Sequence, residues 1–91
     1  MNNQRQSGPG FARGMADFYI LTLTHDEAVG HLRAMVSTCA WFLHASPEPD
    51  PEKACRQAQN AEMFTRIFCD LLNERHGWTF DINQMLAEIR L

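Results

Sequence analysis

Apolar residues recur with a helical period over two long stretches of the chain, roughly residues 24–44 and 51–76. In the first stretch, one helix face carries Ala28, Leu32, Met35, Val36, Cys39, Phe42 and Leu43. In the second stretch, the matching face carries Ala54, Ala58, Ala61, Thr65, Phe68, Cys69 and Leu72. The pattern therefore predicts two long amphipathic helices that pack together as an antiparallel hairpin.

Short sequence signals mark the ends of both helices. Residues 24–27 read T-x-x-E, which is the signature of a capping box at a helix start. Three prolines within residues 46–51 end the first helix, and Asp50 followed by Pro51 is typical of the start of a second. Gly77 is placed to take the left-handed conformation that ends the second helix.

A third, short helix is expected from about Ile82 to Leu91, with Asp81 as its N-cap. A helix this short is unstable alone, so it must dock on the hairpin. We therefore expect an all-α fold, in which two long helices form the hairpin and a short C-terminal helix packs on it.

The N-terminal part of the chain lacks helical periodicity. Residues 1–16 are mostly polar or glycine, and we expect a disordered tail, followed by a single helical domain over residues 17–91. Residues 17–23 read DFYILTL, and this aromatic and β-branched composition favours a short extended segment. Such a segment would pair with its copy or with a partner's sheet. The alternative is that it extends the first helix or packs as an apolar arm.

Both long helices carry more apolar surface than one contact requires. Small residues and one tryptophan line the second face of the first helix, and a bulky stripe lines the second face of the other. These faces predict self-association or binding of another protein, unless the third helix or residues 17–23 cover them. The candidate binding residues are Phe18, Tyr19, Leu21, Gly30, Ala34, Ser37, Trp41, Phe64, Ile67 and Leu71.

Size and charge narrow the choice of partner. With 91 residues, of which 45% are hydrophobic, the chain has more apolar material than a small core can bury, so a homodimer or a protein partner is expected. The net charge is −3 and the eight basic residues are dispersed, which disfavours nucleic acid and anionic membranes. A DNA-binding helix-turn-helix is disfavoured as well, because the third helix offers Asn83, Gln84 and Arg90 but also the acidic residues Asp81 and Glu88.

Nothing in the sequence indicates export or a membrane span. No apolar stretch approaches the roughly 18 residues that a span requires, and residues 18–23 are too short for the core of a signal peptide. Three cysteines form no complete disulfide framework. A cytoplasmic location is therefore expected.

The residues that carry chemistry are scattered. The candidate metal ligands, His25, His31, His44, His76, Cys39, Cys55 and Cys69, show no metal-binding spacing. Glu27 and His31 are four residues apart and form at most a surface pair. Cys55 lies near a helix N-terminus, but no oxyanion-hole signature accompanies it. We expect no metal, no cofactor and no catalysis, and a small Cys/His enzyme is only a remote alternative.

Four segments carry a resemblance to a known family: DFYILTL, THDEA, HLRAMVSTCAWFL and AEMFTRIFCDLL. Their order over residues 17–76 resembles the small helical quorum-sensing anti-activators. Those proteins bind LuxR-type transcription factors and stop them from dimerising or binding DNA. The resemblance implies a regulator that sequesters a transcription factor, and it covers neither the third helix nor any specific functional residue. The alternative is a self-assembling structural protein or a subunit of a complex.

Overall fold

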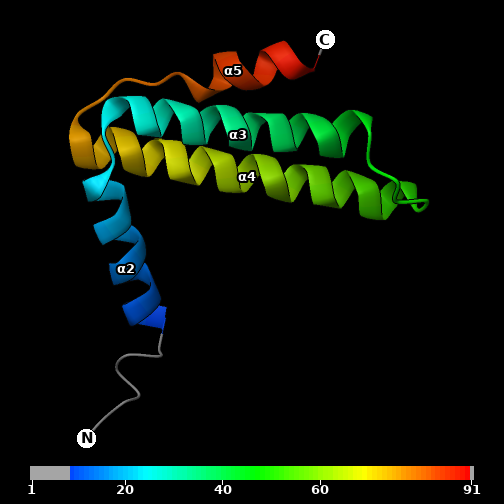
Figure 1. The fold of residues 1–91 in the computed structure, drawn as a ribbon. Helices are drawn as coiled ribbons and strands as arrows, with labels where there is room; N and C mark the ends of the chain where they lie inside the picture. The colour runs from blue at the N-terminus through cyan, green and yellow to red at the C-terminus, as the bar shows by residue number, and fades with distance from the viewer. Residues whose placement is uncertain (1–8, 91) are drawn as a thin grey trace, which may run out of the picture.

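The computed structural model describes residues 9–90, with side chains from residue 14 onward, and within this range it contains four α-helices and no strand. Helices α3 (His25–His44) and α4 (Pro51–His76) form the antiparallel hairpin that the sequence predicts. The short helix α5 (Ile82–Ile89) lies along one side of this pair, and α2 (Pro9–Thr22) leaves from the other side at one end (Figure 1). The chain is therefore an all-α hairpin with one helix docked along it and one helix projecting from it.

The helix ends follow the predicted caps. Thr24 precedes α3, where its hydroxyl accepts the Glu27 amide at 3.1 Å and its own amide donates to the Glu27 carboxylate at 2.9 Å. Asp50 caps α4 by accepting the amide of Glu52 at 3.0 Å. Gly77 ends α4 at φ +71°, a left-handed conformation that costs a residue with a side chain about 1–2 kcal/mol.

The capping box makes the stability of the fold depend on pH through Glu27. Hydrogen bonds from the backbone and side chain of Thr24 lower the pKa of the Glu27 carboxyl, since they favour its charged form. This contribution is present at neutral pH and is lost as the pH falls through the lowered pKa. We expect urea unfolding to show a smaller loss of stability on acidification for Glu27→Gln than for the wild type. Equal losses in the two proteins would contradict this assignment.

The core lies where α3, α4 and α5 meet. Leu32 and Cys39 from α3, Cys69 and Leu72 from α4, and Leu86 from α5 are all fully buried. Ala28, Val36, Ala58, Thr65 and Ile82 complete the buried set along the three helices. The two predicted core faces of the long helices are thus the faces that pack together, although Leu43 is exposed and five residues are only half-buried: Met35, Phe42, Ala54, Ala61 and Phe68.

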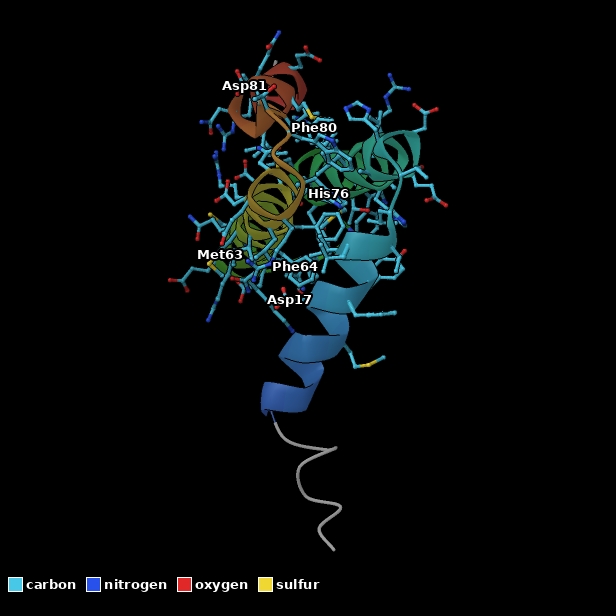
Figure 2. The ribbon with its side chains drawn as sticks, turned by 90° about the vertical axis from the view of Figure 1, so that its left-hand side faces the viewer. Asp17, Met63, Phe64, His76, Phe80 and Asp81 are labelled. Carbon is cyan, nitrogen blue, oxygen red and sulfur yellow. The ribbon has the colours of Figure 1, made fainter. Side chains whose placement is uncertain are left out.

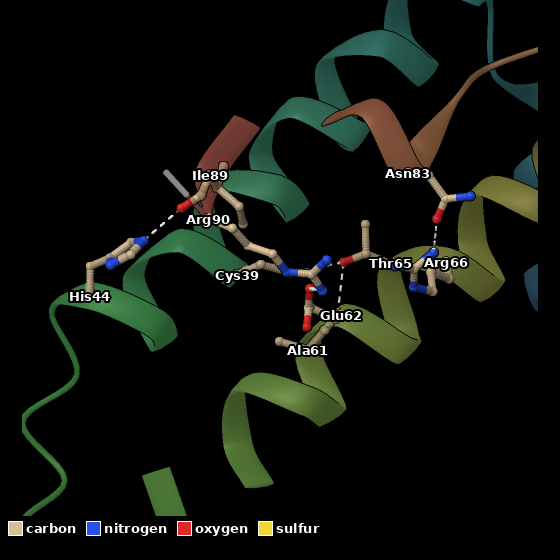
Figure 3. A network of polar contacts seen from close by, with 9 residues as sticks. All are labelled: Cys39, His44, Ala61, Glu62, Thr65, Arg66, Asn83, Ile89 and Arg90. Carbon is tan, nitrogen blue, oxygen red and sulfur yellow. Dashed lines mark hydrogen bonds and ion pairs between the residues drawn. The ribbon is translucent and has the colours of Figure 1, made fainter. Parts of the chain in front are cut away.

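Polar contacts fasten α5 to the hairpin along its length (Figure 3). At its start, the Arg66 guanidinium of α4 donates to the side-chain oxygen of Asn83. At its end, Arg90 pairs with Glu62, and the His44 ring donates to the carbonyl of Ile89 at 2.6 Å. Together with the burial of Ile82 and Leu86, these contacts give the short helix the docking that its length requires.

The prediction of an extended segment at residues 17–23 is wrong. Residues 9–22 form one helix, so the part of the expected disordered tail from residue 9 to residue 16 is helical too, while residues 1–8 lie outside the described part. Ile20, near the end of this helix, and Leu23, just after it, are both buried in the core. Burial of this pair outweighs the β-favouring composition, because a helix also satisfies its own backbone groups and needs no strand partner.

Candidate protein-binding site

A groove opens where α2 meets the underside of the α3–α4 pair. Its volume is about 470 Å³, in the range typical of ligand and peptide sites. The walls are formed by Ala16, Tyr19 and Ile20 of α2, His31 and Met35 of α3, and Phe64, Ile67, Phe68 and Leu71 of α4. In Figure 2, Phe64 lies below α4 and beside α2, on the side of the hairpin opposite Phe80 and Asp81.

The side chains that line the groove are almost all apolar. None of the nine residues that line it carries a carboxylate, an ammonium or a guanidinium group. Its two polar side chains satisfy each other, because the Tyr19 hydroxyl lies 2.8 Å from Nε2 of His31. Among the described side chains that line the groove, a charged ligand would find no counter-ion, whereas an apolar surface would lose no hydrogen bond by entering it.

Large apolar side chains stand exposed in and around the groove. Phe18 of α2 and Phe64 of α4 are each 66% exposed. Among the side chains that the structure describes, the other large exposed hydrophobic ones on these two helices are Met15, Tyr19, Leu21, Met63 and Ile67. Three of these exposed side chains, Tyr19, Phe64 and Ile67, line the one groove, and an exposed apolar patch of this kind is typical of a protein-binding surface.

Three polar contacts set the angle of α2 and thereby keep the groove open. The ring of His76 donates to the carbonyl of Ile20 at 2.7 Å, at the end of the hairpin. The Asp17 carboxylate pairs with the Arg75 guanidinium at 3.4 Å. The Tyr19–His31 contact holds the α3 side. All three contacts join α2 to the hairpin, so α2 stands at a steep angle to it (Figure 1).

The small-residue face of α3 forms a second, separate surface. Gly30, Ala34, Ser37 and Trp41 are all exposed, and a Cβ added at Gly30 would meet nothing within 4 Å. Trp41 instead packs edge-on against its neighbour Phe42, with ring centroids 5.1 Å apart. Neither α2 nor α5 buries this face. We call these four residues the α3 edge.

The candidate binding residues thus fall into three places. Tyr19, Phe64, Ile67 and Leu71 converge on the groove, and the four α3-edge residues lie away from it. Phe18 and Leu21 are exposed on α2 without lining the groove.

Sequence reasoning misses part of the groove wall. The helical pattern assigns Met35 and Phe68 to the core faces, but both are only half-buried and face the groove. Ala16 falls within the expected disordered tail, although it forms part of the α2 wall. One sequence feature could have identified Met35 and Phe68 as groove residues. Both lie at the margin of the apolar stripe of their helix, where buried core positions end and exposed positions begin.

The histidines serve as contacts between elements. His31, His44 and His76 each hydrogen-bond a group on another helix. His25 packs against the rings of Trp78 and Phe80, with centroids 5.0 and 4.9 Å away. Within residues 9–90, no group of three or more His, Cys, Asp or Glu side chains is arranged to hold a metal ion.

The three cysteines differ sharply in access. Cys39 and Cys69 are fully buried, and burial together with the charge of Asp70 raises the pKa of the Cys69 thiol, while Cys55 is exposed. We therefore expect a thiol reagent such as Ellman's to modify one thiol per native chain quickly and all three after unfolding. Cys55→Ser should remove the fast reaction. A second fast thiol in that variant would contradict the buried positions of Cys39 and Cys69.

No family model, curated protein or solved structure matches this chain. Among the described helices, none is both long and apolar enough to cross a membrane. The functional assignment therefore depends on the groove and the surfaces beside it.

Proposed function

We propose that this chain is a small regulatory protein-binding module, and that the groove between α2 and the hairpin receives an apolar helix face of its partner. The observation that carries the proposal is a groove without charged side chains, bordered by large exposed apolar residues such as Phe64 and Ile67. Recognition of an amphipathic helix by an apolar groove is a common mode of protein binding.

The groove chemistry supports a binding role over an enzymatic one. The residues that line it include no cysteine, serine or carboxylate that would act as nucleophile or general base, and its histidine is engaged with Tyr19. The exposed thiol of Cys55 lies on α4 among residues of a different surface, near Phe42 and Glu62. We accordingly assign no catalytic role and no cofactor to the chain.

The partner we propose is a LuxR-type transcription factor in the cytoplasm. The resemblance to quorum-sensing anti-activators motivates this choice. Binding would block the dimerisation of that factor or its contact with DNA. The net charge of −3 agrees with action on the DNA-binding protein, since phosphate contacts require clustered basic residues.

The test uses the purified LuxR-type factor of the host with its promoter DNA. Adding the chain should release the factor from DNA in a gel-shift assay. Ile67→Asp should weaken this effect by at least about 100-fold, because it buries an unpaired carboxylate in the interface. Ala34→Asp places the same charge on the exposed α3 edge and serves as the control. Absence of release by the wild type, or full release by Ile67→Asp, would contradict the proposal.

A second candidate function is that of a self-assembling subunit. The exposed α3 edge favours it, because small residues allow close approach of another helix and Trp41 is of the type that dominates interfaces. In that case Ala34→Asp would disrupt assembly and Ile67→Asp would leave it intact.

A further inference from the structure

We infer that the free protein is a dimer in which α2 of each chain occupies the groove of the other. The inference rests on the binding groove proposed above and names the occupant that it holds in the absence of a transcription factor. Two L-shaped chains interlock about a two-fold axis, so that each chain gives one helix and receives one. Three features of the chain support this occupant: its shape, the complementarity of α2 and groove, and the area available.

The shape of one chain leaves its apolar surface uncovered. The structure measures 48 × 31 × 15 Å, so it is thin in one direction, and its radius of gyration is 15.6 Å. A compact chain of this length would have a radius of gyration of about 12 Å. The difference reflects α2, which projects from the hairpin and packs mainly against the end of α4 (Figure 1).

Each chain carries both halves of the proposed contact. The exposed side chains Met15 and Phe18 lie on α2 but do not line the groove of their own chain. The contacts of Asp17 with Arg75 and of His76 with Ile20 join α2 to the end of α4, and α2 forms one wall of its own groove. A second copy therefore supplies an apolar helix that the groove lacks, and its own groove receives the equivalent helix in return.

Charge does not oppose a second copy at this surface. Each chain has a net charge of −3, so two copies associate best through a surface that brings no like charges together. The groove is such a surface, and the only charged side chain of α2 from residue 14 to residue 22, Asp17, is already paired with Arg75. An interface about a two-fold axis brings identical surfaces close together, which makes the absence of like charges essential.

The exposed area is close to what a stable dimer needs. Leaving Leu21 aside, six large hydrophobic side chains on α2 and α4 are between 48% and 66% exposed: Met15, Phe18, Tyr19, Met63, Phe64 and Ile67. Taking about 200 Å² for a whole large side chain, they offer roughly 700 Å². A standard stable interface buries about 800 Å² on each partner. The half-buried groove residues Met35 and Leu71 add to this area.

The dimer would also regulate the proposed function. If α2 of a second copy fills the groove, a partner helix binds only after the dimer dissociates or in competition with it. Partner binding per chain would then weaken as the concentration of the chain rises above its dimer dissociation constant. Ala34→Asp, which leaves the groove intact, should retain this concentration dependence.

The test measures the mass of the full chain by light scattering and by sedimentation equilibrium over a dilution series. We expect twice the 10.4 kDa of one chain for the wild type and for Ala34→Asp. Ile67→Asp in the groove and Phe18→Lys on α2 should each raise the dimer dissociation constant at least about 100-fold. Both sites are exposed in the single chain, and circular dichroism should confirm unchanged helicity.

Mixing the two weakened variants provides a second, independent readout. In the mixed dimer, the unchanged α2 of the Ile67→Asp chain enters the unchanged groove of the Phe18→Lys chain. The second contact places the lysine introduced at position 18 against the aspartate introduced at position 67. The mixture should therefore recover a dimer that neither variant forms alone. A wild-type monomer, a dimer that Ala34→Asp disrupts, or no recovery in the mixture would each overturn the inference. These measurements need no transcription factor, so a monomer that still releases the factor from DNA would refute the dimer and leave the proposed function standing.

Discussion

Leu72→Ala is expected to destabilise the fold by about 2–5 kcal/mol, the range for truncating a fully buried leucine. Leu72 is 0% exposed and belongs to the cluster where α3, α4 and α5 meet. The truncation would leave a cavity that three helices cannot all close at once. Since a domain of this size has a total stability of only about 5–15 kcal/mol, much of the population should unfold at moderate urea concentration.

The adjacent residue provides a matched control. Leu71 is half-buried, packs against the core on one side and faces the groove on the other, so Leu71→Ala should cost clearly less than Leu72→Ala. Both substitutions are best compared in the Ile67→Asp background, where self-association does not add to the unfolding free energy. Equal losses at the two positions would show that the groove wall is part of the core, and would remove the basis for a binding site there.

The hairpin could be predicted closely because its determinants are local. Thr24 with Glu27, Asp50 with Pro51, and Gly77 each fix a helix end through contacts within a few residues, and the structure has all of these caps. The core faces follow from helical period alone, since a stripe of apolar residues on each helix has one natural partner in a hairpin.

The conformation of residues 9–22 could not be predicted in the same way. Its aromatic and β-branched residues favour a strand locally, and the burial of Ile20 and Leu23 that decides for a helix depends on core residues far along the chain. The direction of α2 depends on partners separated by more than 50 residues, such as Asp17 with Arg75 and Ile20 with His76. No pattern within residues 9–22 encodes those pairings.

The groove exists because α2 takes that direction. The sequence pattern therefore does not predict it. Phe64, Ile67 and Leu71 are predicted as binding residues because they exceed what a hairpin core needs, and Tyr19 because it belongs to residues 17–23, which lack a partner in the expected fold; all four line one groove. The α3 edge is predicted by the same reasoning and lies elsewhere, because residues on one helix face give no information about which other helix stands beside them. The helical period of apolar residues identifies helix faces that the core does not need. Only the arrangement of the helices in space shows which of those faces form one site.

The loop between α4 and α5 depends on a single amide that the sequence pattern does not single out. The side-chain oxygen of Asn73 accepts the amide of Phe80 at 2.9 Å, and its side-chain nitrogen donates to the carbonyl of Phe80 at 3.0 Å. Both backbone groups of Phe80 are thereby satisfied by one side chain. This clamp fixes the chain immediately before Asp81, which begins α5 by accepting the amide of Gln84 at 3.2 Å.

Asn73→Ala should therefore loosen α5 while leaving the hairpin formed. Loss of both hydrogen bonds leaves the Phe80 amide without a partner and its carbonyl with only the weak donor Cys69 Sγ at 3.8 Å, at a cost of about 1–3 kcal/mol. Hydrogen exchange should then accelerate for the amides of residues 80–90 and change little for those in the middle of α3 and α4. Asn73→Asp keeps the acceptor for the Phe80 amide but sets a carboxylate against its carbonyl, so it should loosen α5 as well. A uniform acceleration along the whole chain would mean that α5 is inseparable from the hairpin, because partial opening requires the two to have different stabilities.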